Sequence, residues 1–593
     1  AFAWLPLWFA CLEILIQERK PQAAFLSGLV FALLFLSGSF QVFLGAFYGG
    51  LGYFIFRFFQ TSKNKNSARV NIQAFLFFLA GSFPLWGQLI PSLEFFSLSN
   101  RGGGPQNYWT FNANYSLNPL ALDHALFPAL HLPMGQWMDH AVQNNRDFLA
   151  NALYLGIWIP VLALFAFRPK KDQENAHPRF FLIAGLFTLT LCFGGYFFIY
   201  HLVAHWVPGF ADLRAPYRLS YFWVFSMATL AAGGWQSLES MWRHRQLPKI
   251  WLTAAGFYGL TALVIAAFRP EKTVWELSAL LLGFMGFGLT LRKKTKWIGL
   301  NLLGVALLLP LLLRGWEIFF PAPYSNFDFA ANSKSLMKLT SPLMPSRIML
   351  DPHQVPYPIK VRGKLYVSYY PENVFVALRL KDFGGYNPLS LKSVNDLRFL
   401  PTDKLFKLMA IQGFLTDKAG SALRGFDEKT DTFLHLYKSR FSGALAFAPQ
   451  RWQVLEKSQD QLTAMKASAF DPYHEGILSN PLPTSESSRL TGKPAALRYR
   501  LLKDEPSAQS FQISLSRDSL VVFSEVAYPG WEARLDGVPA KILTADHALR
   551  AIFIPAGSHR VDFTYQPWWM PWIFAPWVFT LAVGFWLFRQ ERF

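Results

Sequence analysis

Residues Met570 to Phe588 read MPWIFAPWVFTLAVGFWLF, an apolar segment without an acidic or basic side chain. A helix of this length can cross the roughly 30 Å hydrocarbon layer of a bilayer. About ten further apolar segments precede it: Ala1 to Ile16, Ala23 to Gly38, Val42 to Phe59, Ile72 to Pro91, Leu149 to Phe167, Phe180 to His201, Leu219 to Gln236, Ile250 to Phe268, Trp275 to Leu291 and Ile298 to Leu313. The sequence therefore predicts a polytopic α-helical membrane domain with about eleven transmembrane helices.

The composition agrees with a membrane protein: 52% of the residues are hydrophobic and only 16% are charged. The net charge of +19 is carried by alternate short loops, such as the loop with Lys63, Lys65 and Arg69. The positive-inside rule makes those loops cytoplasmic. The basic balance is thus a topology signal and argues against nucleic-acid binding. We expect a multi-pass protein of the bacterial cytoplasmic membrane, with its large domain outside the cytoplasm.

The long polar region from Trp316 to Gln566 falls on the outer side by this topology. Residues 316–495 mix helical and extended patterns and predict an α/β region. From Ala496 onward, short alternating runs with an Asp536-Gly537 hairpin signal predict an antiparallel β-sandwich over residues 496–567. The expected organisation is a helical membrane domain (1–315, with an outer loop at 92–148), these two outer regions, and a last transmembrane helix (568–593).

Several motifs occur in a characteristic order along the chain. They are Trp4-Leu5-Pro6-Leu7, Pro91 to Arg101, Arg214-Ala215-Pro216-Tyr217-Arg218, Gly385-Tyr386-Asn387-Pro388-Leu389, Ser524 to Gly537 (SEVAYPGWEARLDG), Ile554 to His559 (IPAGSH) and Tyr565-Gln566-Pro567. In this order they resemble the YfhO family of bacterial multi-pass membrane proteins. The resemblance covers essentially the whole chain except the N-terminal part of that family, so we expect a fragment that lacks the first membrane segment and the first outer loop.

The resemblance implies kinship with the glycosyltransferase-C superfamily. Such enzymes move a sugar from a polyprenyl-phosphate-linked donor to an acceptor on the outer face of the membrane. Here the acceptor would be a cell-envelope glycopolymer or glycolipid, and the usual catalytic carboxylate would lie upstream of this sequence. The implied partners are the lipid-linked donor, the acceptor and membrane lipids.

The phosphate of a lipid-linked donor would lie at the outer membrane surface, so the candidate site residues are charged side chains predicted near that surface. Arg101, Arg214 and Arg218 are placed to bind the donor phosphate, because a guanidinium engages phosphate oxygens in a bidentate way. The alternative is that these arginines are interfacial anchors. Glu94, just beyond Pro91, is the best-placed general base among the outer-loop acids. The alternative is that each of these acids is an ordinary solvated side chain. The others are Asp123, Asp139, Asp147 and Asp212.

The same outer loop holds three histidines, but their spacing does not match a zinc motif. These are His124, His131 and His140. We therefore predict no dedicated metal site, and a divalent cation (Mg²⁺ or Mn²⁺) on the donor phosphate stays open.

Two other function classes remain open. A non-enzymatic protein that binds or assembles envelope polysaccharide would use exposed aromatic side chains such as Tyr528 and Trp531. A transporter would need ionisable residues near the middle of the bilayer, and Glu13, Arg57 and Glu276 lie near segment ends instead.

Overall fold

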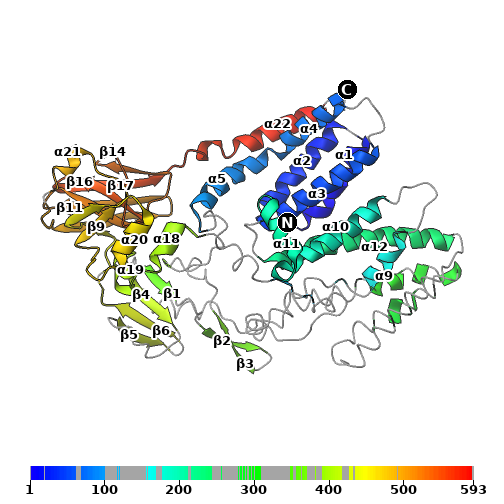
Figure 1. The fold of residues 1–593 in the computed structure, drawn as a ribbon, viewed down its shortest axis with the longest axis horizontal. Coiled ribbons are helices and arrows are strands. Elements are labelled where there is room, and N and C mark those ends of the chain that lie inside the picture. The colour runs from blue at the N-terminus through cyan, green and yellow to red at the C-terminus, as the bar shows by residue number, and fades with distance from the viewer. Residues whose placement is uncertain are drawn as a thin grey trace. The chain divides into compact units, whose positions relative to one another are not determined.

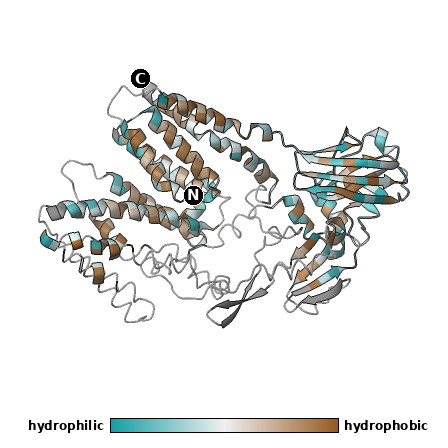
Figure 2. Ribbon diagram, turned by 180° about the vertical axis from the view of Figure 1, so that it is seen from behind, coloured by the Kyte–Doolittle hydropathy of each residue, from teal (hydrophilic) through white to brown (hydrophobic). Residues whose placement is uncertain are grey.

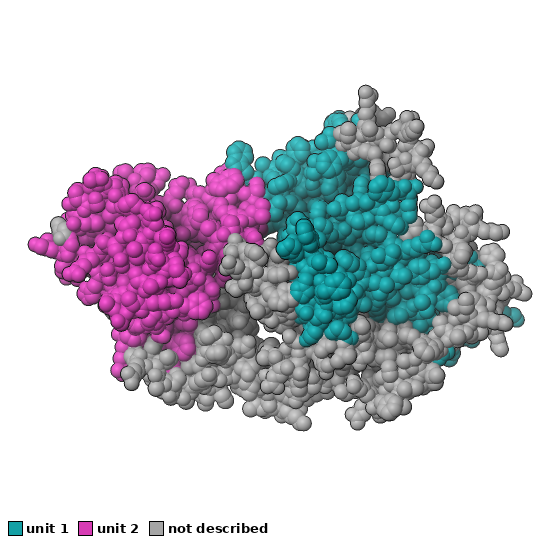
Figure 3. Space-filling model, viewed as in Figure 1, with its two compact units in different colours: residues 1–89, 104–323, 572–593 teal, residues 90–103, 324–571 magenta. Residues whose placement is uncertain are grey.

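The structure is a computed structural model of the chain, and it divides into two compact units (Figure 3). Unit 1 comprises residues 1–89, 104–323 and 572–593, and unit 2 comprises residues 90–103 and 324–571. The residues whose structure is described are 2–18, 20–61, 68–100, 116–117, 119, 155, 158–167, 176–210, 215–243, scattered positions between 256 and 308, 347–350, 356–361, 364–369, 381, 383, 390–416, 426–431, 434–441, 443–490 and 492–589.

Unit 1 is helical. Figure 1 shows α1 to α4 packed beside one another, with α22 along α4. The helices are α1 (Trp4–Glu18), α2 (Pro21–Leu36), α3 (Phe40–Thr61), α4 (Ala68–Ser82), α9 (Trp158–Phe165), α10 (Ala176–Cys192), η4 (Gly194–Tyr196), α11 (Phe198–Trp206), η5 (Pro216–Leu219), α12 (Ser220–Arg243), η7 (Lys293–Thr295) and α22 (Ala575–Arg589); α5 (Pro84–Leu98) crosses into unit 2.

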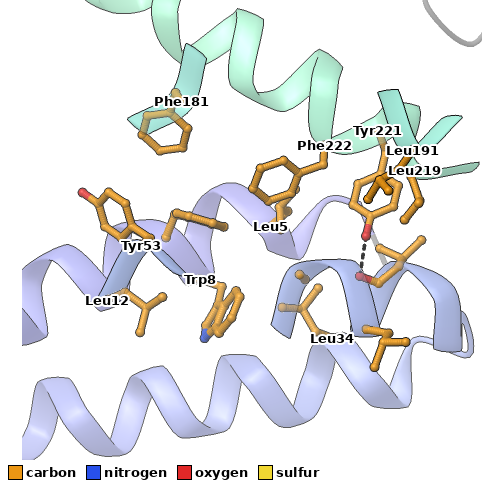
Figure 4. Packing of buried hydrophobic residues seen from close by; sticks show 14 of the residues in the cluster. Leu5, Trp8, Leu12, Leu34, Tyr53, Phe181, Leu191, Leu219, Tyr221 and Phe222 are labelled. Carbon is orange, nitrogen blue, oxygen red and sulfur yellow. Dashed lines mark hydrogen bonds between the residues drawn. The ribbon is translucent and has the colours of Figure 1, made fainter. Parts of the chain in front are cut away.

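Aromatic and aliphatic side chains together form the core of unit 1 (Figure 4). Phe9 lies at its centre, with ring centroids 5.4 Å from Tyr53 and 5.8 Å from Phe222. The Tyr221 hydroxyl donates to the Val42 carbonyl at 2.7 Å, which ties α12 to α3. Glycine allows α2 and α4 to touch, because a Cβ on Gly28 would lie only 2.0 Å from the Phe78 carbonyl oxygen.

The prediction of about eleven transmembrane helices is wrong for this structure. Within the described residues, one helix is long and apolar enough to cross a membrane, Met570–Arg589, with 20 residues. A second candidate exists only if Gln73–Ser82 and Pro84–Leu98, which are bent by 61° at their break, form one span. No many-span bundle is evident among the parts of the chain that the structure describes.

Helix length explains most of this correction. Several apolar segments fold as helices of 15 to 17 residues, among them α1, α2, α4 and α10. At 1.5 Å per residue these reach about 22 to 26 Å, short of the hydrocarbon layer. Helices α3 and α12 are longer, with 22 and 24 residues, and α12 carries polar side chains such as Glu239.

The candidate membrane helix has two different faces. Its Thr580 hydroxyl donates to the Ala80 carbonyl at 2.9 Å, so this face packs on α4. On the opposite face Val578, Leu581 and Phe585 are 66%, 69% and 70% exposed. Figure 2 shows the same hydrophobic colouring along the helices of unit 1. Exposed apolar surface of this kind is typical of contact with lipid or with another protein.

Unit 2 is rich in strands. Its elements are β1 (Arg347–Leu350), β2 (Pro356–Val361), β3 (Lys364–Tyr369), α18 (Lys392–Leu397), α19 (Thr402–Leu408), β4 (Ile411–Thr416), β5 (Phe426–Asp431), β6 (Leu434–Ser439), β7 (Ala446–Phe447), β8 (Arg451–Val454), α20 (Ser458–Lys466), β9 (Glu475–Leu478), α21 (Thr484–Ser487), β10 (Leu497–Glu505), β11 (Ala508–Leu515), β12 (Ser519–Val526), β13 (Trp531–Leu535), β14 (Val538–Ala540), β15 (Leu543–Ala545), β16 (Leu549–Ile554), β17 (Gly557–Tyr565) and η9 (Met570–Trp572).

Two sheets face each other in the C-terminal part of unit 2. One has the order β10-β11-β17-β13-β14 and the other β7-β12-β16-β15-β9-β8; a separate sheet has the order β1-β4-β6-β5. The facing sheets are not wholly antiparallel, because β8 and β9 run parallel. The hairpin predicted at Asp536-Gly537 is confirmed: β13 and β14 pair across these two residues, whose φ angles are 51° and 84°.

Strand β12 is the centre of this architecture, because it is buried on both faces. Val521 and Phe523 point between the sheets, where the Phe523 ring lies 4.9 Å from Phe563 and 5.0 Å from Phe511. Leu520 and Val522 point the other way, into a second core completed by side chains of α19 and α20. The nearly continuous apolar run of β12 reflects this double burial.

We therefore predict that residues 496–566 do not fold alone, whereas residues 347–567 do. The short fragment lacks β7 to β9 and the helices that cover the second face of β12. Urea unfolding, followed by tryptophan fluorescence and circular dichroism, should show one cooperative transition for the long fragment and none for the short one. A cooperative transition in the short fragment would contradict this architecture.

A buried acid sits in the turn between β15 and β16. Asp546 is fully buried and has a φ of 47°, its Oδ1 accepts the Ile477 N–H at 2.9 Å, and its Oδ2 has no hydrogen-bond partner among the described residues. Burial raises the pKa of Asp546 to about 7, and the Glu475 carboxylate adds to the rise. The folded state thus keeps a proton that the unfolded chain, with a pKa near 3.9, releases.

The Asp546 pKa makes the stability of unit 2 depend on pH. Between about pH 4 and pH 7 the free energy of unfolding should fall as the pH rises, by up to about 1.4 kcal/mol per pH unit, and then level off. Asp546→Asn should remove this slope. The measurement is the urea midpoint of residues 347–567 at pH 5 and pH 8. Since the variant keeps the neighbouring His547, equal slopes in the two proteins would exclude Asp546 as the cause.

Candidate functional site

Glu94 lies on helix α5, not in the loop where the sequence predicts it. Within unit 2, three side chains that are distant in sequence donate hydrogen bonds to its carboxylate. The Tyr528 hydroxyl lies 3.3 Å from Oε1, the Trp568 Nε1 lies 3.3 Å from Oε2, and the Trp569 Nε1 lies 3.5 Å from Oε1. We call Glu94, Tyr528, Trp568 and Trp569 the Glu94 cluster.

Backbone geometry brings these segments together. Tyr528 follows β12, and Trp568 and Trp569 follow β17, so the two loops leave the same end of the neighbouring sheets. The connection between β12 and β13 turns at Gly530, whose φ is 93° and whose carbonyl accepts the Gln566 N–H at 2.7 Å. A Cβ at Gly530 would lie 2.9 Å from the Pro567 Cα, so glycine is needed for this close approach.

Aromatic rings extend the cluster. Tyr528 lies between Phe95 and Tyr565, with ring centroids 6.4 Å and 6.3 Å away. Burial raises the pKa of Tyr528 to about 12, with a further rise from the Glu94 charge, so the phenol keeps its proton and remains a donor at neutral pH. The Trp568 side chain is 68% exposed, which leaves a flat apolar ring beside a carboxylate at the surface.

This combination suits recognition of a carbohydrate. A sugar presents hydroxyl groups, which a carboxylate binds through charge-assisted hydrogen bonds, and an apolar C–H face, which an indole can cover. The cluster does not suit a metal cation, because the groups around Glu94 are donors. Both Glu94 oxygens already accept hydrogen bonds. The role of Glu94 as a general base stays a prediction.

The other predicted site residues are elsewhere or undescribed. Arg218 lies in η5 of unit 1; its side chain is exposed, and its Nη1 donates to the Gln41 Oε1 at 3.1 Å. Arg101 and Arg214 lie outside the described residues, as do the outer-loop acids and histidines named from the sequence: Asp123, Asp139, Asp147, Asp212, His124, His131 and His140.

No local sequence pattern marks the partners of Glu94. Tyr528 and Trp568 follow it by 434 and 474 residues, so their contact with Glu94 depends on the fold. Trp531, proposed with Tyr528 for sugar stacking, is partly buried instead, and the Arg550 guanidinium lies 4.2 Å from the centre of its ring.

Comparison with protein-family models, with curated proteins and with solved structures finds no match for this chain.

Proposed function

We propose that this protein is a membrane glycosyltransferase that moves a sugar from a polyprenyl-phosphate-linked donor to a cell-envelope glycopolymer or glycolipid. The observation that carries the proposal is the place of the Glu94 cluster in the chain. Trp568 and Trp569 directly precede the candidate membrane helix Met570–Arg589. Side chains suited to a sugar therefore lie where the chain would enter the apolar layer, which is where the head of a lipid-linked sugar would be found.

The resemblance to the YfhO family supports the same proposal, and it adds the bacterial cytoplasmic membrane and its outer face as the site of action. The exposed apolar face of α22 supports attachment to a membrane by this helix. In this proposal Glu94 and Trp568 contact the sugar, and Tyr528 and Trp569 hold the carboxylate in place.

One observation favours a second candidate, a protein that binds envelope polysaccharide without transferring a sugar. The Glu94 oxygens are occupied by three donors, which suits fixed recognition better than proton transfer. Both candidates predict that the Glu94 cluster contacts glycan, and they differ in whether a covalent product forms.

Substitution of Glu94 by glutamine tests the proposal. Glutamine keeps the size of the side chain and loses the charge, so sugar incorporation in membranes supplied with the lipid-linked donor should fall roughly 10- to 150-fold. Glu532→Gln is the matched control, because Glu532 is an exposed acid on β13. An unchanged rate for Glu94→Gln would remove the cluster from the reaction. The second candidate would be supported if Glu94→Gln lost glycan binding while the unaltered protein bound glycan and transferred no sugar.

A further inference from the structure

Unit 1 contains a cavity of about 650 Å³ between α1, α3, α10 and α12. It is separate from the Glu94 cluster, which belongs to unit 2. Its walls are mostly apolar, and polar side chains gather in one part of it.

The lining residues of the cavity run along two helices. On α1 the lining residues Pro6, Ala10 and Gln17 fall on one face at helical spacing. On α12 the same holds for Phe225, Ala228, Ala232 and Gln236. From Pro6 to Gln17, and from Phe225 to Gln236, the face runs about 16 Å at 1.5 Å per residue. Each face begins apolar and ends at a glutamine.

The polar part of the cavity carries a compensated ion pair. The Glu13 carboxylate accepts from Arg57 Nη2 at 2.8 Å and from Arg57 Nε at 3.2 Å. It also accepts from the Tyr53 hydroxyl at 2.7 Å and from Gln17 Nε2 at 2.6 Å. Since the guanidinium balances the carboxylate, no net charge remains to hold a charged ligand head group.

His177 completes this part of the cavity. Its Nδ1 lies 2.8 Å from the Tyr53 hydroxyl, whose proton is donated to Glu13, so Nδ1–H donates to the Tyr53 oxygen. Burial and the Arg57 charge lower the pKa of His177, which favours the neutral ring. Its Nε2 is then an acceptor, 3.7 Å from the acceptor Oε1 of Glu13. Glu13 Oε1 already accepts from Arg57 and Gln17, so the lone pair of His177 Nε2 is the acceptor that this part of the cavity offers to a ligand.

We propose that this cavity binds an uncharged single-chain amphiphile, whose apolar chain lies along α1 and α12 and whose hydroxyl group donates to His177 Nε2 beside the Glu13 carboxylate. A long-chain alcohol or a monoacylglycerol has this chemistry. The apolar lining removes part of the chain's surface from water, and the compensated pair disfavours both phosphate and ammonium heads.

Photolabelling of the whole protein in lipid nanodiscs tests the proposal without any variant. The probes are dodecanol, dodecyl phosphate and dodecylamine, each with a diazirine near the chain end. We expect dodecanol adducts on lining residues at the apolar end, such as Phe9 and Phe225, at roughly ten times the yield of the charged probes. Preferred labelling by dodecyl phosphate would overturn the uncharged head group. Adducts spread over the exposed faces of α10 and α22 would overturn the site.

Variants then separate the chain site from the head-group site. Ala228→Phe and Ala10→Phe, at two solvent-accessible lining positions on different helices, should each abolish the mapped adducts. Leu7→Phe, at an exposed position on α1 outside the lining, should leave them unchanged. His177→Ala should lower dodecanol labelling roughly tenfold and leave labelling by the corresponding dodecane diazirine unchanged. An equal loss of labelling by the dodecanol and dodecane probes would contradict the head-group contact.

Discussion

Replacing Glu525 by leucine is expected to lower the free energy of unfolding of unit 2 by about 3 to 5 kcal/mol, because it leaves two buried guanidinium groups without their counter-charge. Glu525 Oε1 lies 2.7 Å from Arg347 Nη2, and Oε2 lies 3.7 Å from Arg550 Nη2. The Arg550 side chain is only 2% exposed, and its Nε and Nη1 have no hydrogen-bond partner within the described part of the chain. Burial lowers the pKa of Arg550 to about 10, so the group stays charged at neutral pH.

The matched control for this prediction is Glu505→Leu on β10. Glu505 also pairs with a cation, Lys503 at 2.9 Å, but the two side chains are 56% and 49% exposed. Its replacement should change the free energy of unfolding by less than about 1 kcal/mol. The measurement is urea unfolding of residues 347–567. Equal effects of the two substitutions would show that the Glu525 network does not stabilise the sandwich.

Replacing Arg218 by alanine is expected to lower sugar incorporation roughly 30- to 1000-fold, because the phosphate contact that the sequence predicts for this guanidinium would stabilise the transition state by about 2 to 4 kcal/mol. The same loss is expected for Arg214→Ala. Arg218 is exposed, and its Nη1 donates to Gln41 Oε1 at 3.1 Å. Arg218→Lys should restore only part of the rate, because lysine keeps the charge and loses the planar fork.

Gln41→Ala separates a phosphate contact from a packing role. This substitution removes the hydrogen-bond partner of Arg218 and keeps the guanidinium. The rate of sugar incorporation should therefore stay within a few-fold of that of the unaltered protein. Incorporation assays at matched protein levels make the comparison. If Gln41→Ala and Arg218→Ala cause the same loss, Arg218 acts through the structure of η5 rather than through the donor.

Strands and turns of unit 2 were predictable because their signals are local. The alternation in Phe511 to Leu515, the apolar run of β12 and the Asp536-Gly537 turn each act within a few residues. The SEVAYPGWEARLDG motif also has structural reasons. Ser524 donates to the Ala444 carbonyl at 2.7 Å, Glu525 joins the buried network, and Gly530 makes its tight turn.

The helical domain and the site were less predictable, because they depend on where helices end and on distant partners. Apolarity does not fix helix length: α1 ends at Glu18 and α2 begins at Pro21, which leaves both helices short of a span. A window of hydropathy cannot show the 61° bend before Pro84 either. The partners of Glu94 come from loops that only the folded sandwich places beside α5.

The most direct test of the proposed function is sugar transfer by the purified protein in lipid bilayers that contain a radiolabelled polyprenyl-phosphate sugar and an envelope glycolipid acceptor. We predict a labelled acceptor that forms with the unaltered protein and falls roughly 10- to 150-fold with Glu94→Gln. No labelled acceptor with any lipid-linked sugar, from protein whose sandwich unfolds cooperatively, would contradict the assignment as a glycosyltransferase.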